Sequence, residues 1–524
     1  MKRTVHPLWY LALATGLTLF TFGQWDTPLA NWLLPLFLLR FLRQYHSRWA
    51  IVLAWVATSV TTYVVSMGMY PLPVPFDLIL VIVTGLIALL PYCADRWLHH
   101  RIPGFASTLI FPTALVTLGY FDTLTSPYGS WGNIAYTQID VPWIAQLASL
   151  SGMWGITFLI GWTASTANWL WERQFTRRQL YRWSLVYASV MILVLLHGWI
   201  RLMFVPSETP TAQIATVVPS TKRMFGMLPG DGVVQKLLAG TTLSDNEEQI
   251  VRESFQELAA ELFLQSAEAA QDGAQIILWP EAVIWTLGFD RDVLIAQGQA
   301  FAQEHQVTLG IGVATFHPGS QHNNQLVLLQ PGGEIAWVYD KANLVPVVEE
   351  GIFAAGDGVI PVIATEHGNI GGVICYDLDH HDFIRQASAS NVDMLLAPVG
   401  DWVGIAKIHN DMARMRAIEN GITVVRATRG GYSTVIAPTG AVLALDDNAD
   451  VHFDGTFVES SSPVGISVLQ AEMPTQRMET LYGVIGDVFA WASVAVFAGL
   501  VVRGIMHRRQ ASKLVPQPDG AVPV

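Results

Sequence analysis

The sequence predicts a multi-span α-helical membrane domain joined to an α/β domain outside the cytoplasm. Of its 524 residues, 52% are hydrophobic and only 14% are charged, whereas an ordinary soluble domain is about 25% charged. The shortage of charge is concentrated before residue 205. From there to residue 475, strand-like and helical patterns alternate, which is typical of an α/β sandwich or another layered fold.

Eight apolar stretches have roughly the length that a helix needs to cross a bilayer, about 20 residues. They cover residues 8–24, 26–42, 49–69, 76–95, 105–121, 143–170, 182–204 and 484–506. Buried core helices are also apolar, but eight such stretches with basic residues in alternate connectors favour membrane spans. No small-residue cleavage motif follows the first stretch, so we expect it to be retained as a span.

Basic residues mark one side of the membrane. They precede the first span and follow the second, fourth, sixth and last: Lys2, Arg3, Arg40, Arg43, Arg48, Arg96, Arg101, Arg173, Arg177, Arg178, Arg182, Arg503, Arg508, Arg509 and Lys513. By the positive-inside rule both termini are cytoplasmic. We therefore expect a multi-pass protein of the inner (cytoplasmic) membrane. Its parts would be a membrane domain (1–205), a periplasmic or extracytoplasmic catalytic domain (206–476), and a last span with a cytoplasmic tail (477–524).

The external domain is acidic. Residues 207–475 contain 12 Lys and Arg against 33 Asp and Glu, a net charge of −21, while the whole chain carries −13. Nucleic-acid binding relies on basic surfaces, so no nucleic-acid partner is expected. A segment of this length is sufficient for one large hydrophobic core.

Apolar periodicity places the elements of this domain in order. Strands are predicted at 213–218, 276–278, 307–315, 324–329, 334–339, 369–374, 393–397, 422–427 and 432–437, and helices at 249–271, 290–306 and 408–420. The last helix is expected to end at Gly421, because glycine favours the left-handed conformation of a C-cap.

Cys375 ends the apolar run 371–375 (GGVIC), which predicts a buried strand with a thiol at its tip. The only other cysteine, Cys93, is predicted to lie near the cytoplasmic end of the fourth span, so the two cannot form a disulfide within the chain. An unpaired cysteine in an oxidising compartment indicates a reactive role. The alternative is an inert, buried cysteine.

Two other reactive side chains occupy similar positions. Glu281 follows the run 276–280 (IILWP), and Lys341 follows 335–340 (IAWVYD). A carboxylate, an ammonium and a thiol at strand ends are the components of a cysteine acyl-transfer site. Each residue also has a simpler interpretation, as a surface carboxylate or a solvated turn lysine.

Other motifs are weak. Asp377, Asp379, His380, His381 and Asp382 superficially resemble a metal cluster, but adjacent turn residues seldom converge on one ion. The pair Gly310 and Gly312 lacks the third glycine and the helix of a dinucleotide loop. We therefore expect neither a metal nor a cofactor.

The segments 279–281 (WPE), 339–341 (YDK) and 374–377 (ICYD) resemble the three motifs of the nitrilase, or carbon-nitrogen hydrolase, superfamily. With the membrane spans, the chain resembles the apolipoprotein N-acyltransferase branch. Further similar passages are 341–349, 411–419 (DMARMRAIE) and 149–159. The resemblance implies a nitrilase-like αββα sandwich, with Glu281, Lys341 and Cys375 as catalytic residues.

The resemblance also implies an activity. An acyl chain would pass from a membrane phospholipid to a Cys375 thioester, and then to the N-terminal amine of a diacylglyceryl-modified lipoprotein. Glu281 would act as base, and Lys341 would stabilise the oxyanion together with the Tyr376 backbone N–H. Glu349 would orient Lys341 or the amine, while Tyr376 and Asp377 would support the nucleophile.

Several positions depart from this branch. Asp377 replaces a glutamate, residues 398–402 (PVGDW) replace an Asn-Asp-Ala-Trp pattern, and Arg429 replaces a small or amide residue. These changes leave two other functions open, a membrane-anchored nitrilase-type amidase and a catalytically inactive polytopic binding or transport protein. Apolar residues in the segments 224–238 and 345–353 are expected either to form lids over a lipid site or to pack on the core.

Overall fold

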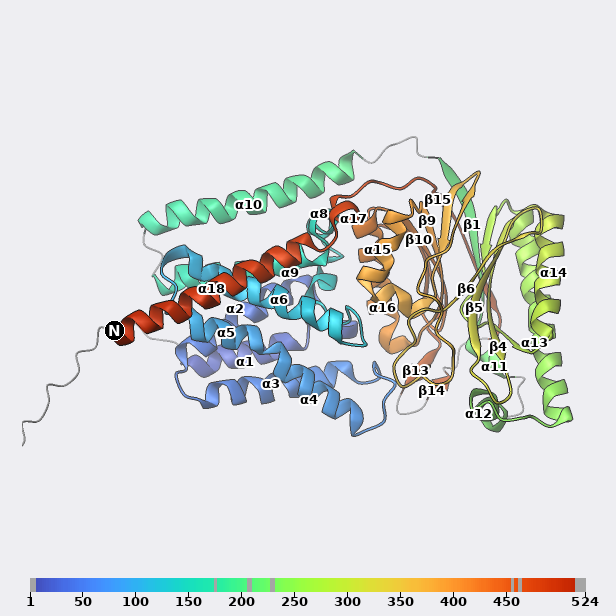
Figure 1. The fold of residues 1–524 in the computed structure, drawn as a ribbon, viewed down its shortest axis with the longest axis horizontal. Coiled ribbons are helices and arrows are strands. Elements are labelled where there is room, and N and C mark those ends of the chain that lie inside the picture. The colour runs from blue at the N-terminus through green and yellow to red at the C-terminus, as the bar shows by residue number, and fades with distance from the viewer. Residues whose placement is uncertain are drawn as a thin grey trace, which may run out of the picture.

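The computed structural model describes residues 6–173, 177–204, 210–226, 231–453, 457–459 and 464–513. A helical domain and an α/β domain lie end to end along the long axis of the molecule (Figure 1). Helix α18 (Val488–Lys513) returns to the helical domain after the α/β domain and packs on α6 (Ile110–Thr125). The predicted combination of a multi-span helical domain and an α/β sandwich is confirmed.

The helices of the first domain follow the predicted apolar stretches. They are α1 (Pro7–Thr18), α2 (Pro28–Gln44), α3 (Trp49–Ser66), α4 (Phe76–Ala88), α5 (Leu90–Leu98), α6, α7 (Pro142–Ala145), α8 (Ala148–Ser151), α9 (Met153–Glu172) and α10 (Arg177–Met203). Within the residues described, five helical segments are long and apolar enough to cross a membrane, or six if the bent α7–α9 segment is one span. Helices α1 and α2, with 12 and 17 residues, are shorter than these five segments and shorter than the roughly 20 residues that a span needs.

One predicted span, 143–170, is not a straight helix. The segment bends by 119° between Ser151 and Met153. Gly152 adopts a positive φ of 62° there, and a Cβ atom at this position would lie only 2.5 Å from the Tyr482 ring. The close approach of this aromatic ring, which belongs to α17 (Leu481–Ile485), therefore accounts for the glycine at the bend.

A buried ion cluster joins three helices of this domain. The Arg43 guanidinium donates to Asp95 at 2.7 Å and to Glu172 at 3.2 Å. Glu172 ends α9, whose other end touches the α/β domain, and a 20-residue helix is about 30 Å long. The cluster therefore lies at the end of the helical domain that is remote from the α/β domain.

The α/β domain consists of four layers (Figure 1). One sheet has the order β15 (Ile466–Pro474), β1 (Thr211–Pro219), β2 (Ile276–Leu278), β4 (Thr308–Phe316), β5 (Asn323–Leu329), β6 (Ile335–Asp340), with β3 (Ile284–Leu287) beside β4. The other has the order β12 (Val442–Asp447), β11 (Tyr432–Ile436), β10 (Thr423–Arg429), β9 (Met394–Gly400), β8 (Gly368–Gly372), β7 (Val362–Thr365). Helices α13 (Asp245–Gln271) and α14 (Asp290–His305) cover the first sheet, and α15 (His381–Ala389) and α16 (Val403–Asn420) cover the second.

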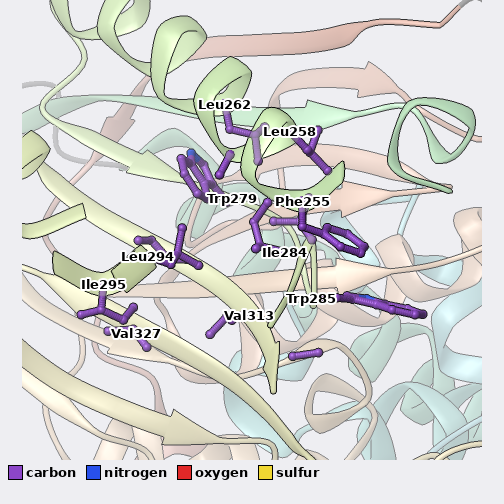
Figure 2. Close-up of a cluster of buried hydrophobic side chains, with 14 of the residues drawn as sticks. Phe255, Leu258, Leu262, Trp279, Ile284, Trp285, Leu294, Ile295, Val313 and Val327 are labelled. Carbon is purple, nitrogen blue, oxygen red and sulfur yellow. The ribbon is translucent and has the colours of Figure 1, made fainter. Parts of the chain in front are cut away.

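Two hydrophobic cores hold these layers together, and a third joins them to the helical domain. The outer core lies between α13, α14 and the first sheet, where Phe255, Leu258, Trp279 and Trp285 pack against one another (Figure 2). A second core fills the space between the two sheets. A third joins α16 to the helical domain. Since burying one large apolar side chain contributes about 1.5–3 kcal/mol, this third core fixes the two domains firmly together.

Polar contacts reinforce the contact between the domains. The backbone N–H of Met153 donates to Glu419 at 2.8 Å, and Glu419 also pairs with the buried Arg416 at 2.9 Å. The Trp402 indole donates to the carbonyl of Gly68 at 2.8 Å. Helix α16 begins at Val403 rather than at the predicted residue 408, so its first turn also takes part in this interface.

Candidate active site

The three predicted catalytic residues meet where strands of both sheets end. Glu281 follows β2, Lys341 follows β6, and Cys375 follows β8 in the opposite sheet. All three side chains are buried. The Lys341 Nζ atom lies 2.8 Å from Glu281 Oε1. Two sheets packed face to face therefore bring together groups that are up to 94 positions apart in the sequence.

Lys341 is held between two carboxylates. Besides Glu281, it contacts Glu349 at 2.7 Å, and Glu349 accepts the backbone N–H of Val345 at 2.8 Å. Burial opposes the lysine charge, but the two carboxylates outweigh it and raise the Lys341 pKa well above its usual value. The ammonium is therefore positive at neutral pH. Glu349 contacts Lys341 in this geometry, and whether it orients the lysine or the incoming amine stays a prediction.

Glu281 and Cys375, the predicted base and nucleophile, both lie close to Gly400. The Cys375 Sγ atom lies 3.7 Å from the Gly400 carbonyl oxygen. The Glu281 Oε2 atom lies 3.1 Å from the point that a Gly400 Cβ would occupy. The other oxygen of Glu281 accepts hydrogen bonds from Lys341 and from Asn324, each at 2.8 Å. One carboxylate oxygen is thus fixed by hydrogen bonds, and the other is directed at the surroundings of the thiol.

Cys375 sits in a strained backbone conformation. Its φ is +48°, a value that is uncommon for a residue with a side chain and frequent at functional turns. Burial, and then the charge of Glu281, raise the pKa of the thiol well above its usual value. The resting site therefore contains a neutral thiol, so catalysis needs a base that removes its proton.

Asp377 joins the loop that follows Lys341 to the turn that contains Cys375, which we call the nucleophile turn. It accepts hydrogen bonds from the Tyr339 hydroxyl at 2.7 Å, from the Asn343 backbone and side chain at 2.8 Å each, and from the Ile374 N–H at 2.9 Å. Burial raises the pKa of Asp377, although these hydrogen bonds oppose the shift. An aspartate at this position therefore has a complete set of partners, which explains how the site accommodates the departure from glutamate.

Tyr376 connects the turn to the helical domain. Its hydroxyl donates to the carbonyl of Pro127 at 2.8 Å. In the next turn, the Ser130 N–H donates to the carbonyl of Asp379 at 3.0 Å. The nucleophile turn is therefore supported from both domains.

A buried histidine lies near the thiol, and the sequence alone does not indicate it. His409 contacts Asp401 at 2.7 Å and Asp379 at 3.3 Å, and Arg426 pairs with Asp401 at 2.8 Å. Burial opposes its charge, but the two aspartates raise the pKa of His409 to about 10. Among the residues described, no group of His, Cys, Asp or Glu is arranged to hold a metal. Asp377, Asp379 and His381 instead bind three different partners.

An apolar pocket opens at Cys375 between the two domains. Its walls are Met69, Tyr70, Pro71, Leu72, Tyr128 and Trp131 of the helical domain and Val345, Pro346, Cys375, Tyr376, Gly400, Trp402, Ile405 and His409 of the α/β domain. The predicted nucleophile is therefore accessible from a mainly apolar cavity.

The two apolar segments differ in their behaviour. Met224, Val233 and Leu237 are buried in the outer core, so this connector packs on the domain instead of forming a lid. Residues 227–230 lie outside the described structure. In the second segment Val345 lines the pocket, while Val347 is 68% exposed. Of the described residues in these two segments, those that border the cavity belong to the second.

Comparison with known proteins gives two family matches. Residues 14–166 match the apolipoprotein N-acyltransferase N-terminal domain, and residues 247–450 match the carbon-nitrogen hydrolase domain. The first lies in the helical part and the second in the sandwich, so the expected nitrilase-like character of the sandwich is confirmed.

Two individual relatives agree with the first of these matches, and one solved structure is similar to part of the chain. An apolipoprotein N-acyltransferase of Geobacter metallireducens is 24% identical over 493 residues, which covers 88% of this chain and 85% of the relative. Another, of Pseudomonas syringae pv. tomato, is 26% identical over 375 residues and covers 66% and 67%. The crystal structure of an amidase from Nesterenkonia sp. is 18% identical, covers 52% of this chain and 94% of that one, and aligns with a TM-score of 0.39.

Proposed function

The chain belongs to the apolipoprotein N-acyltransferase family, and on that premise we propose that it forms a thioester between Cys375 and an acyl chain of a membrane phospholipid. It then transfers this chain to the N-terminal amine of a diacylglyceryl-modified lipoprotein. The observation that carries the proposal is the apolar pocket at Cys375, whose walls come from both domains. The mainly apolar walls suit a lipid chain, whereas a small polar amide would find few hydrogen-bond partners along them.

Glu281, Lys341 and Cys375 carry out both half-reactions in this proposal. Glu281 Oε2 removes the proton from Sγ, and the sulfur attacks the carbonyl carbon of the donor ester. The ammonium of Lys341, at the same site, stabilises the negative oxygen of the tetrahedral intermediate. When the intermediate collapses, the ester C–O bond breaks, and the proton on Glu281 passes to the departing lysophospholipid alcohol.

In the second half-reaction the thioester gives up the acyl chain and the sulfur is the leaving group. The acceptor amine attacks the thioester carbonyl, and Glu281 takes a proton from the nitrogen. Collapse breaks the C–S bond, gives the N-acyl product, and returns the proton to the sulfur. Between the two steps the thioester must be protected from water, which the apolar pocket walls favour.

The lifetime of the acyl-enzyme tests this function. With phospholipid alone, we expect intact-protein mass spectrometry to detect one acyl chain on Cys375 that persists. A diacylated lipopeptide with a free amine should discharge it and form an N-acyl product, while an N-acetylated lipopeptide should not. A thioester that is lost to free fatty acid at the same rate with either peptide would indicate an amidase-type hydrolase instead.

We further propose that this membrane protein lies in the inner membrane with its α/β domain outside the cytoplasm. The basic connectors support this orientation, since Arg43 and the start of α10 lie at the end remote from the α/β domain. In a Cys93→Ser background, a membrane-impermeant thiol reagent should label Asp245→Cys in intact cells but not Arg178→Cys. The reverse pattern of labelling would contradict the proposed orientation.

A further inference from the structure

Arg429 lies one strand away from the residue that the nucleophile contacts. Strands β9 and β10 run parallel, with Arg429 opposite Gly400. The N–H of Asp401 donates to the Arg429 carbonyl at 2.8 Å. Since the Gly400 carbonyl meets the Cys375 thiol at 3.7 Å, the backbone of Arg429 is fixed beside the reacting centre.

The guanidinium group extends into the same space. Its Nη2 atom lies 2.9 Å from the point that a Gly400 Cβ would occupy, next to Glu281 Oε2 at 3.1 Å from that point. The group also stacks over Phe225, with 5.6 Å between the guanidinium carbon and the ring centre. A residue with a side chain at position 400 would push both charged groups away. The glycine therefore gives the arginine access to the site.

Arg429 has no anionic partner in the described part of the chain. No carboxylate there lies within 4.0 Å of its nitrogen atoms, and its buried Nε has no hydrogen-bond acceptor. Arg416 and Arg426, on α16 and in β10, both pair with carboxylates. A half-buried cation without an anionic partner is costly, because it has lost part of its hydration. An anionic ligand would remove that cost.

We propose that Arg429 binds the phosphodiester of the acyl donor, an inference that rests on the proposed function. The guanidinium fork matches two phosphate oxygens. In a glycerophospholipid, glycerol carbons separate the reacting ester from the phosphate by roughly 6 Å, given single bonds of about 1.5 Å. Arg429 is outside the lining of the apolar pocket. The acyl chain would therefore occupy the pocket while the phosphate lies on Arg429.

The charge of the acceptor indicates that Arg429 binds the acyl donor rather than the acceptor. The diacylglyceryl-modified acceptor presents an amine and has no phosphate, so a cation at this position offers it no attraction. The domain around Arg429 is strongly acidic, with a net charge of −21 over residues 207–475. A local cation is therefore needed if the site is to hold an anionic group beside Glu281 and Glu349.

The test compares two acyl donors in the full-length protein. The rate of acylation of Cys375, normalised by donor concentration, is measured by intact-protein mass with phosphatidylglycerol and with diacylglycerol carrying the same chains. We expect Arg429→Gln to lower the ratio of the phospholipid rate to the diacylglycerol rate about tenfold or more, which is the usual scale for charge-assisted hydrogen bonds. Arg429→Lys should retain much of the ratio.

Matched variants separate charge from packing. Arg252→Gln alters an ion-paired arginine on α13 and should leave the ratio unchanged. Phe225→Leu removes the stacked ring but keeps the charge of Arg429, so it should lower the ratio less than Arg429→Gln does. Inorganic phosphate is added to the diacylglycerol assay of each variant, so that binding of free phosphate can be distinguished from binding of the phosphate within the lipid. If Arg429→Gln changes only the effect of phosphate, or lowers both rates equally, the inference is overturned. If neither lipid acylates wild-type Cys375, the proposed function fails and this inference fails with it.

Discussion

Replacing Cys375 by alanine is expected to abolish the acyl-enzyme and all acyl transfer, while the protein still folds and inserts. The reason is that the C–S bond of the intermediate cannot form without Sγ. The strained φ of +48° is no worse for alanine than for cysteine, and the sulfur makes one weak contact, at 3.7 Å to the Gly400 carbonyl. Intact-protein mass after incubation with phospholipid, together with a thermal unfolding curve, measures both effects.

The second cysteine provides the control. Cys93 lies on α5 in the helical domain, so Cys93→Ala should transfer acyl chains at the wild-type rate. Product formation by Cys375→Ala above the rate without enzyme would exclude the thioester mechanism. A variant that also unfolds would be replaced by Cys375→Ser, which has nearly the same volume and a much weaker nucleophile.

The sequence predicts these reactive groups because each one follows an apolar run. Glu281, Lys341 and Cys375 are polar residues directly after buried strands, which is a local pattern. Their partners Asn324 and Gly400 carry no such signal. Asn324 lies inside β5 and Gly400 at the end of β9, and each matters only through the residue that packing brings to it. Non-local pairing of this kind is invisible along a single strand.

The pocket shows the same limit. Residues 69–72 form part of the pocket wall. They follow α3 and lie about 300 positions before Cys375 in the sequence. His409 belongs to α16, where the helical pattern predicts packing and gives no hint of two buried aspartates as partners. The fold of the α/β domain brings Asp379, from the turn after β8, and Asp401, which follows β9, to this helix.

Secondary structure was predicted best where apolar periodicity was strong. Strands β1, β4 and β5 and helices α13 and α14 match their predicted ranges closely. Strands β12 and β15 were missed. In β12 every second residue is exposed, as befits the edge of a sheet, and β15 forms by antiparallel pairing with β1 from the other end of the domain. Such strands depend on a neighbour more than on their own composition.

Replacing Lys341 by methionine is expected to reduce acyl-enzyme formation by at least about 10²-fold, the usual scale for losing one oxyanion-stabilising group. Here the loss should be larger, because Lys341 also holds Glu281 at 2.8 Å through Oε1, the oxygen that Asn324 holds as well. Methionine fills nearly the same volume without the charge. Single-turnover acylation by phospholipid, followed by intact-protein mass, measures the change.

The same substitution should destabilise the protein. Glu281 and Glu349 would become buried carboxylates without a cation, and breaking a buried pair typically costs about 3–5 kcal/mol. Lys236→Met is the matched control. The side chain of Lys236 is 44% exposed and pairs with Glu247, so its loss should cost no more than about 1 kcal/mol and leave acylation unchanged.

The pH dependence of this instability distinguishes charge from packing. Burial already raises the pKa of Glu349, and Lys341 opposes that rise, so the pKa should increase further in Lys341→Met. Above the ordinary glutamate pKa, the native variant then binds more protons than its unfolded chain, so its stability must fall as the pH rises toward neutral. Denaturation at a series of pH values should therefore show a gap from the wild type that widens from pH 5 to pH 8. A gap that is constant with pH would mean that lost packing, rather than two unpaired carboxylates, destabilises the variant, and Lys341 would then not be the cation that balances this site.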